Sequence, residues 1–208
     1  MTAYSLAQSV VSTYKPTEWS PMTTQKEVLL EELGSTSAEF RNVELKIRRS
    51  LPVSISRVVR VQNPYLYGCY LLKKEEYVNR YGTVTEKELF HATGTHNVSS
   101  IVQQNLNWRL STRTKFGMGV SFSPDASYAN QHCNRSNPLS RAMFVAKVLV
   151  HSTCLGSSYM MLPSVGSDTS TGNNGSVYVK YSDNEFYPTY VAYYTSPPIV
   201  FRRRRFFY

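Results

Sequence analysis

The sequence predicts a single α+β domain, and three observations lead to this fold class. Helical apolar spacing dominates the first part of the chain, whereas short strand patterns separated by turn residues dominate the second part. The 208 residues suffice to bury one hydrophobic core of ordinary size. No internal repeat appears, and no change in composition divides the chain in two. We therefore expect helices packed on sheets around one core rather than alternating βαβ units.

The first 20 residues are rich in serine, threonine and tyrosine without clear periodicity, and they are predicted to be a flexible leader. A helix is predicted to begin at Thr23 or Thr24 and to end at Gly34, with four apolar residues on one side: Val28, Leu29, Leu30 and Leu33.

A second helix is predicted after Ser37, which can cap it, with apolar residues at helical spacing: Phe40, Val43, Ile47 and Leu51. Residues 53–61 then alternate in the manner of a strand with a partly charged face. Pro64 opens a third predicted helix that runs to about Tyr77. A turn at Gly82 leads into the next strand.

The middle of the chain is predicted to contain a helix beginning near Asn97, a basic loop over residues 108–118 and a strand that ends at Phe122. Pro124 and Asp125 suit the first turn of a short helix, because proline has the required φ and the acid complements the helix dipole.

The last part of the chain is predicted to hold a buried strand with nearly continuous apolar character at 142–150. Its other predicted segments are a polar loop, a flexible excursion, and two strands joined by a turn: 134–140, 162–176, 176–181 and 187–194, with the turn at 182–185.

The formal net charge of +9 favours anionic partners without selecting one of them. Part of this charge lies in residues 198–208, a basic and aromatic tail with four consecutive arginines at 202–205. Such a tail can serve in nucleic-acid binding or nuclear import, but basic chain ends are more often solvated and without such a role.

Three cysteines, without metal-ligand spacing, indicate a reducing compartment and exclude a disulfide framework. His132 and Cys133 are adjacent, but no second cluster completes a zinc site, so no metal is expected. The sequence contains no apolar stretch of about 20 residues and no secretory signal. We therefore expect an intracellular protein, cytoplasmic or nuclear, without a membrane partner.

The chemistry is predicted to centre on two stretches, residues 88–93 and residues 116–122. The first is a short apolar strand that ends on His91 and is followed by small residues, which leave the backbone accessible. The second contains Gly117 and Gly119, which allow close approach of the main chain to a ligand. A histidine and exposed backbone amides at a strand end can recognise a planar amide and a ribose together.

These stretches belong to a series of motifs that resembles the catalytic domain of the PARP branch of ADP-ribosyltransferases, nearest the mono-transferring subgroup. The family's Leu-Phe-His-Gly/Ala-Thr, Asn-Phe-Asp-Trp-Arg, Gly-x-Gly-x-Tyr-Phe and Met-Phe-Val-Ala-Lys-Val-Leu motifs match here in the same order, at 89–93, 105–109, 117–122 and 143–149. The resemblance is sharp over about residues 84–195 and softer over 35–80.

The resemblance implies the ADP-ribosyltransferase fold, a split, six-stranded antiparallel sheet pair with flanking helices around an NAD cleft. It implies that residues 21–197 form one catalytic domain and that NAD is the substrate. His91 would hydrogen-bond a ribose hydroxyl, and the backbone of Ala92 would hold the nicotinamide amide, with Thr93 following as in the family. Arg109 would meet the NAD pyrophosphate, or would face water beside a Trp108 that anchors the loop.

Several positions depart from the family pattern. Ser121 stands where the family's Gly-x-Gly-x-Tyr motif has a tyrosine that packs against the nicotinamide. Gly119 matches the second glycine of that motif. Ala129 replaces an amide-binding serine, and His132 replaces a second stacking tyrosine. Val177 replaces the glutamate of polymer-forming members, so chain elongation is not expected.

Two neighbouring residues are interpreted as non-catalytic: Glu185 as a solvent-facing turn residue and Tyr128 as a packing residue. The resemblance thus predicts NAD-dependent mono-ADP-ribosyl transfer to a protein acceptor. The alternatives are a catalytically inactive member of the same fold that acts as a binding module, and a nucleic-acid binder that uses the basic surface.

Overall fold

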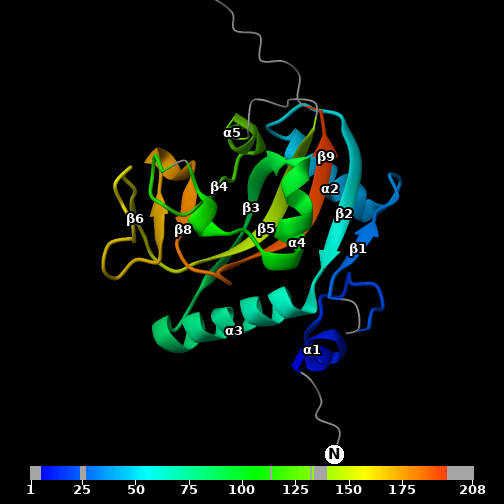
Figure 1. Cartoon of the computed structure of the whole chain (residues 1–208), viewed down its shortest axis with the longest axis horizontal. Coiled ribbons are helices and arrows are strands. Elements are labelled where there is room, and N and C mark those ends of the chain that lie inside the picture. The colour runs from blue at the N-terminus through cyan, green and yellow to red at the C-terminus, as the bar shows by residue number, and fades with distance from the viewer. Residues whose placement is uncertain (1–5, 24–26, 113, 132, 134–139, 196–208) are drawn as a thin grey trace, which may run out of the picture.

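Two β-sheets organise the chain in the computed structural model, which describes residues 6–23, 27–112, 114–131, 133 and 140–195. The larger sheet has five antiparallel strands in this order: β1 (Leu29–Glu32), β2 (Ile55–Gln62), β9 (Phe186–Tyr194), β5 (Arg141–Val150) and β3 (Thr85–Gly94). The smaller sheet has the order β4 (Val120–Phe122), β8 (Tyr178–Lys180), β7 (Thr169–Thr171) and β6 (Thr153–Leu155). Figure 1 shows the smaller sheet to one side of the larger. The predicted α+β class and split sheet pair are confirmed, with five and four strands instead of six in all and with one parallel pair, β6–β7.

The sheets meet along one edge of β3. Phe90 donates its N–H to the carbonyl of Ser123 at 2.7 Å, and the Ser123 N–H donates back to Phe90 at 2.9 Å. Beyond this bridge, the outer edge of β3 is not paired with another described strand. The candidate site lies at this junction.

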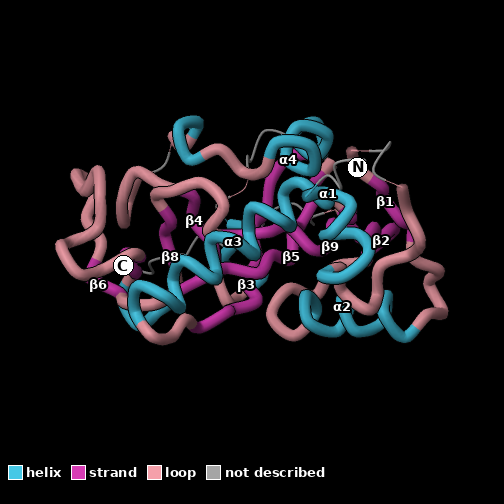
Figure 2. Tube along the Cα trace, turned by 90° about the horizontal axis from the view of Figure 1, so that it is seen from below, coloured by secondary structure: helices cyan, strands magenta, loops and turns pink. Residues whose placement is uncertain are grey.

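Helices cover both faces of the larger sheet and one end of the sheet pair (Figures 1 and 2). In chain order, the described helical segments are α1 (Leu6–Ser9), the π-turn Val10–Tyr14, α2 (Ala38–Arg48), α3 (Pro64–Tyr81), the 3₁₀ turn Thr95–Asn97, α4 (Val98–Gln104), the 3₁₀ turn Trp108–Leu110, α5 (Ala126–Gln131) and the 3₁₀ turn Asn173–Gly175.

The helix signals in the sequence act locally as predicted. Ser37 accepts a hydrogen bond from the Phe40 N–H at 3.1 Å and so caps α2. Asn63 caps α3 ahead of Pro64, and Gly82 ends that helix with a positive φ of 78°.

The strand β5 is buried on both faces, which explains its continuous apolar run. Phe144, Ala146 and Val148 pack toward α4 and β4, whereas Met143 and Val145 pack toward α2 and α5. The core therefore lies on both sides of the central strand.

The helix predicted from Thr23 or Thr24 to Gly34 is wrong in its described part. Leu29–Glu32 form the edge strand β1, which pairs with residues 59–62 of β2. A short apolar run does not distinguish a strand from a helix, and here the free edge of β2 supplies the backbone hydrogen bonds.

Residues 6–20 are not a flexible leader in this structure. Trp19 is 6% exposed and lies against Tyr67 and Tyr187, with ring centroids 5.4 Å and 6.5 Å away. Ser20 accepts a hydrogen bond from the buried Arg60 side chain at 2.8 Å. The segment is thus packed onto α3 and the larger sheet.

The predicted flexible excursion over 162–176 is also wrong in part, because it contains β7, in which Thr169 and Ser170 are fully buried. Most of the predicted polar loop at 134–140 and the whole 198–208 tail lie outside the described residues. Among the described helices, none has the length and apolar character needed to cross a bilayer.

Candidate functional site

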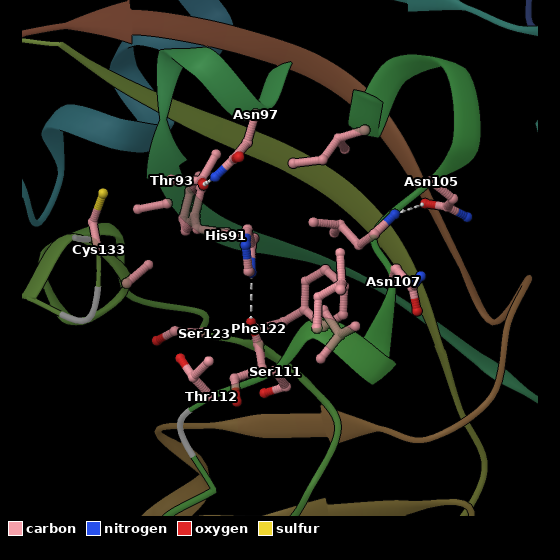
Figure 3. Close-up of a pocket in the computed structure, with 18 of the residues that line it drawn as sticks. His91, Thr93, Asn97, Asn105, Asn107, Ser111, Thr112, Phe122, Ser123 and Cys133 are labelled. Carbon is pink, nitrogen blue, oxygen red and sulfur yellow. Dashed lines mark hydrogen bonds between the residues drawn. The ribbon is translucent and has the colours of Figure 1, made fainter. Parts of the chain in front are cut away.

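A cavity of about 860 Å³ lies at the junction of the two sheets, between β3, β4, α4 and α5. It brings together seven of the predicted site residues: His91, Ala92, Thr93, Arg109, Ser121, Ala129 and Val177. These residues come from five separate segments, so the shared cavity is a result of the tertiary fold. Figure 3 shows His91 in the middle of the cavity lining, above Ser123 and Phe122.

His91 is held in one orientation by the glycine-loop strand. Its Nδ1 lies 2.9 Å from the carbonyl oxygen of Ser121, which can only accept a hydrogen bond, so Nδ1 carries the proton (Figure 3). Burial lowers the pKa of His91, and the hydrogen bond to Ser121 opposes this shift. The neutral ring then keeps Nε2 as a hydrogen-bond acceptor on a residue that lines the cavity.

Ala92 offers both of its backbone hydrogen-bonding groups at the outer edge of β3. Strand residues alternate between their two neighbours, and Phe90 directs its N–H and C=O away from β5 toward Ser123. Ala92, two residues later, therefore directs its own N–H and C=O to the same outer edge, where it lines the cavity. A donor and an acceptor so placed match a planar carboxamide.

Thr93 has a structural contact as well as its place in the lining. Its Oγ1 accepts a hydrogen bond from the Asn97 side chain at 2.9 Å, which ties the end of β3 to the start of α4 (Figure 3). The side chain is nearly buried. Its predicted contact with a cofactor stays a prediction.

Near Ser121 and Val177, no described acidic side chain lines the cavity. Ser121 is exposed, and Val177 is buried in a cluster with Val179 and Tyr181. Tyr128 is half-buried, packs against this cluster as predicted, and lines the cavity as well. Burial raises the pKa of Tyr128, with its hydrogen bond to Ser176 acting in the opposite direction. Tyr128 thus supplies a ring that the sequence analysis had assigned to packing alone.

The glycines of the second stretch are required by packing, and their predicted close approach to a ligand stays a prediction. A Cβ at Gly119 would lie 2.2 Å from the carbonyl oxygen of Lys180 on β8. Gly117 has φ = 131°, and a Cβ there would overlap the Tyr181 hydroxyl. Close packing against the smaller sheet therefore requires both glycines. His132 lies outside the described residues.

One end of the cavity, here called the distal end, is lined by Arg109 and Asp183, and Trp108 lies against Arg109. Arg109 forms two hydrogen bonds with the Asp183 carboxylate, both of 3.1 Å, and its guanidinium lies 4.4 Å from the Trp108 ring centroid. Trp108 is half-buried and packs on the main core, as the anchoring interpretation expected. The sequence analysis missed Asp183, because a single acid in a polar turn carries no distinguishing pattern.

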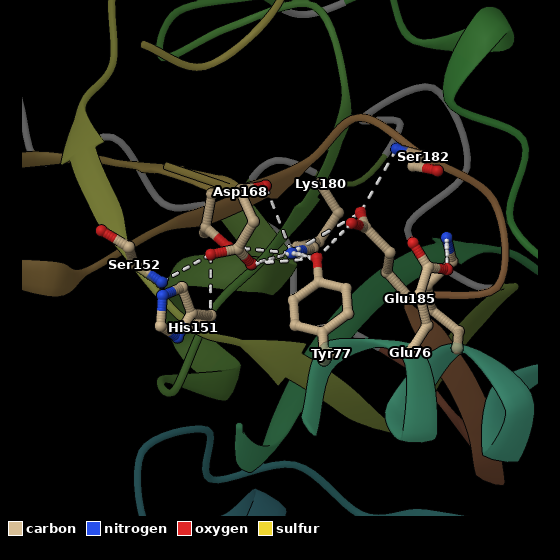
Figure 4. Close-up of polar contacts among 10 residues, drawn as sticks. Glu76, Tyr77, His151, Ser152, Asp168, Lys180, Ser182 and Glu185 are labelled. Atoms are coloured by element: carbon tan, nitrogen blue, oxygen red, sulfur yellow. Dashed lines mark hydrogen bonds and ion pairs between the residues drawn. The ribbon is translucent and has the colours of Figure 1, made fainter. Parts of the chain in front are cut away.

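Glu185, predicted to face solvent, is only 5% exposed and belongs to a buried ion cluster with Tyr77, Asp168 and Lys180 (Figure 4). Lys180 Nζ lies 2.5 Å from Asp168 Oδ2 and 3.5 Å from Glu185 Oε2, and the Tyr77 hydroxyl donates to Glu185. Burial raises the pKa of Glu185, although Lys180 lowers it. Glu185 therefore belongs to the buried scaffold and does not reach the cavity as a substitute acid.

No group of three or more His, Cys, Asp or Glu side chains suited to a metal ion occurs in the part of the chain that the structure describes. None of the three cysteines forms a disulfide: Cys69 is exposed, Cys154 is half-buried and Cys133 is buried in the lining of the cavity.

Comparison with known proteins agrees with this geometry. The family model of the poly(ADP-ribose) polymerase catalytic domain matches residues 35–185. The human protein mono-ADP-ribosyltransferase PARP12 is 31% identical over 178 residues, which cover 79% of this chain and 25% of the relative. The human protein mono-ADP-ribosyltransferase PARP14 is 28% identical over 192 residues, or 85% of this chain and 11% of the relative. The matched region thus spans a quarter or less of the length of these relatives.

Proposed function

The chain belongs to the poly(ADP-ribose) polymerase catalytic domain family, and we propose that it is a protein mono-ADP-ribosyltransferase. It would transfer one ADP-ribose from NAD to an acceptor side chain and release nicotinamide. The names of the mono-ADP-ribosyltransferase relatives support the single transfer. So does Val177, which has no polar group to activate the hydroxyl of an ADP-ribose that is already attached.

The observation that carries the proposal is the hydrogen bond between His91 and Ser121. It fixes the imidazole tautomer, so that Nε2 accepts a hydrogen bond from a hydroxyl of the nicotinamide ribose. The N–H and C=O of Ala92 would bind the carboxamide of the nicotinamide beside it. Together these groups orient the glycosidic bond that breaks, which is the main contribution that a protein makes to a reaction of this type.

The acceptor must supply part of the chemistry itself. No described carboxylate lies in the cavity near Val177, since Glu185 is buried elsewhere and Asp183 is paired with Arg109. As NAD loses nicotinamide, the acceptor side chain attacks the ribose carbon, and its proton leaves to solvent or to an acid on the acceptor protein.

A second candidate function, a binding module without turnover, is favoured by one observation. Ser121 and Ala129 give the cavity neither the aromatic face nor the hydroxyl that the family uses at these positions. Each missing contact costs roughly 1 kcal/mol of NAD affinity, and the losses add when the positions are independent.

The experiment is incubation of the purified chain with NAD, read by mass spectrometry for free nicotinamide and for protein that carries a single ADP-ribose. His91→Ala should abolish both products, whereas His96→Ala, which changes an exposed histidine outside the cavity, should retain them. Binding of NAD without either product would favour the binding module. Products that survive in His91→Ala would overturn the proposed site.

The proposal also covers the acceptor of the ADP-ribose and the cellular compartment of the protein. We propose a protein acceptor in a reducing intracellular compartment, in keeping with three cysteines that form no disulfide. Nucleic-acid binding by the basic tail stays a prediction.

A further inference from the structure

The distal end of the cavity carries an ion pair between Arg109 and Asp183, and the proposed transfer reaction gives no role to Asp183. The turn with Asp183 precedes Phe186, the first residue of β9. Phe186 pairs with Val148 on β5, and Val148 pairs with Lys87 on β3. Lys87 lies four residues from His91, or roughly 13 Å along the strand. Arg109 and Asp183 line the same cavity as His91, and a dinucleotide that extends from His91 toward the start of β9 would meet them.

Arg109 is arranged as an anion site at this end. Its guanidinium lies over the Trp108 ring and presents two N–H groups in parallel to Asp183. A planar guanidinium in this orientation binds a carboxylate and a phosphate with the same geometry. Both side chains remain half-exposed, at 54% and 51%, so a ligand can reach them.

Asp183 is held in place by the fold on the other side of its turn. Glu185 accepts a hydrogen bond from the Ser182 N–H at 3.3 Å and is itself fixed by Tyr77 and Lys180 (Figure 4). The carbonyl of Glu185 accepts from the Leu149 N–H of β5 at 2.8 Å. The carboxylate of Asp183 is thus presented to Arg109 from a turn whose backbone is anchored on one side by buried contacts.

We propose that Asp183 is an internal competitor for Arg109 and that it weakens the binding of diphosphate-containing ligands in this cavity. The diphosphate of a nucleotide and the carboxylate of Asp183 seek the same guanidinium, and the two anions repel each other when both are near it. The ion pair therefore tunes the affinity of the cavity for nucleotides without touching the nicotinamide end. This inference rests on the proposed function, because it assumes that the cavity takes a dinucleotide.

The test is the affinity of Asp183→Asn for ADP-ribose, measured by calorimetry at low ionic strength, together with its affinity for nicotinamide, which has no phosphate. ADP-ribose should bind roughly two- to fivefold more tightly than to the wild-type chain, the range expected for removing an exposed ion pair. Added salt should reduce this gain. The affinity for nicotinamide should not change.

Glu32→Gln is the matched control. Glu32 pairs with Arg57 at 2.8 Å, the guanidinium lies 5.2 Å from the Tyr193 ring centroid, and both side chains are about half-exposed. The substitution changes the net charge by the same amount, but the pair lies on β1 and β2, outside the cavity. It should leave ADP-ribose affinity as it is in the wild type.

An equal gain in Glu32→Gln, an unchanged or weaker affinity in Asp183→Asn, or the lack of ADP-ribose binding in every variant would overturn the inference. Failure of the proposed function looks different. If ADP-ribose binds and responds to Asp183→Asn but NAD yields no transfer product, the competitor role stands and the enzymatic role falls.

Discussion

The cavity and the buried ion cluster both contain many polar groups, but those groups differ in whether a ligand can reach them. In the cluster, Lys180 and Glu185 bond to each other and to their neighbours, and burial leaves them no contact with a ligand. In the cavity, a hydrogen bond to Nδ1 fixes the His91 ring, and the strand β3 fixes Ala92. The His91 Nε2 and the backbone N–H and C=O of Ala92 then remain available to a ligand in the cavity. Buried charges that bond only to one another thus indicate a structural role. Polar residues that use one group to hold their position and keep a second group available indicate a binding site.

The strongest way to break this comparison is to remove the cation of the cluster. Lys180→Met keeps the length of the side chain but leaves Asp168 and Glu185 facing each other without a positive charge. We expect a loss of about 3–5 kcal/mol in the free energy of unfolding, measured by urea denaturation. Lys46→Met, which removes a half-exposed pair with Glu88, should cost about 1 kcal/mol or less. Equal losses in the two variants would contradict a scaffold role for the cluster.

The same contrast explains which parts of the structure could be predicted from the sequence. The helix after Ser37 and the strand β5 follow from local signals, a capping side chain and a continuous apolar run, and both are confirmed. The contact between His91 and Ser121 was predicted from the order of the family motifs. The residues next to each of them in the sequence do not indicate that the two lie close together.

What the sequence did not reveal depends on partners that are distant in the chain. Glu185 is buried because Tyr77 and Asp168, 108 and 17 residues away, complete its surroundings. Trp19 is packed only because Tyr67 and Tyr187 provide an aromatic surface. Neither contact leaves a periodic trace in the sequence around the residue itself.

A second prediction sharpens the comparison from the side of the cavity. Ser121→Tyr restores an aromatic ring at an exposed position of the lining, while its carbonyl still accepts from His91. Stacking on the nicotinamide should raise NAD affinity by about 0.5–1.5 kcal/mol, or roughly two- to tenfold, in a calorimetric titration. Stability should change little. An unchanged affinity would place the nicotinamide away from Ser121.

The smallest expected effect concerns pH. Burial raises the pKa of Glu185 in the folded chain, so its contribution to stability is fully present below its unfolded pKa and is lost as pH rises through the folded value. Glu185→Gln removes this titration and keeps an acceptor for the Tyr77 hydroxyl. The variant should therefore gain stability over the wild type as pH rises above about 4.5, and the gain should shrink below it.

Thermal unfolding followed between pH 4 and pH 8 measures this difference. A variant that is less stable than the wild type by the same amount at every pH would show that Glu185 is ionised and required throughout the range.

The most direct test of the account is a titration of the ¹⁵N-labelled chain with NAD, followed through the backbone amide resonances. If the outer edge of β3 binds the nicotinamide carboxamide, the amides of Ala92 and Ser121 should shift strongly and saturate with NAD. The amide of Leu89, which faces β5, should shift little, and His91→Ala should remove the response. Saturable binding that leaves the Ala92 amide unmoved would contradict the account.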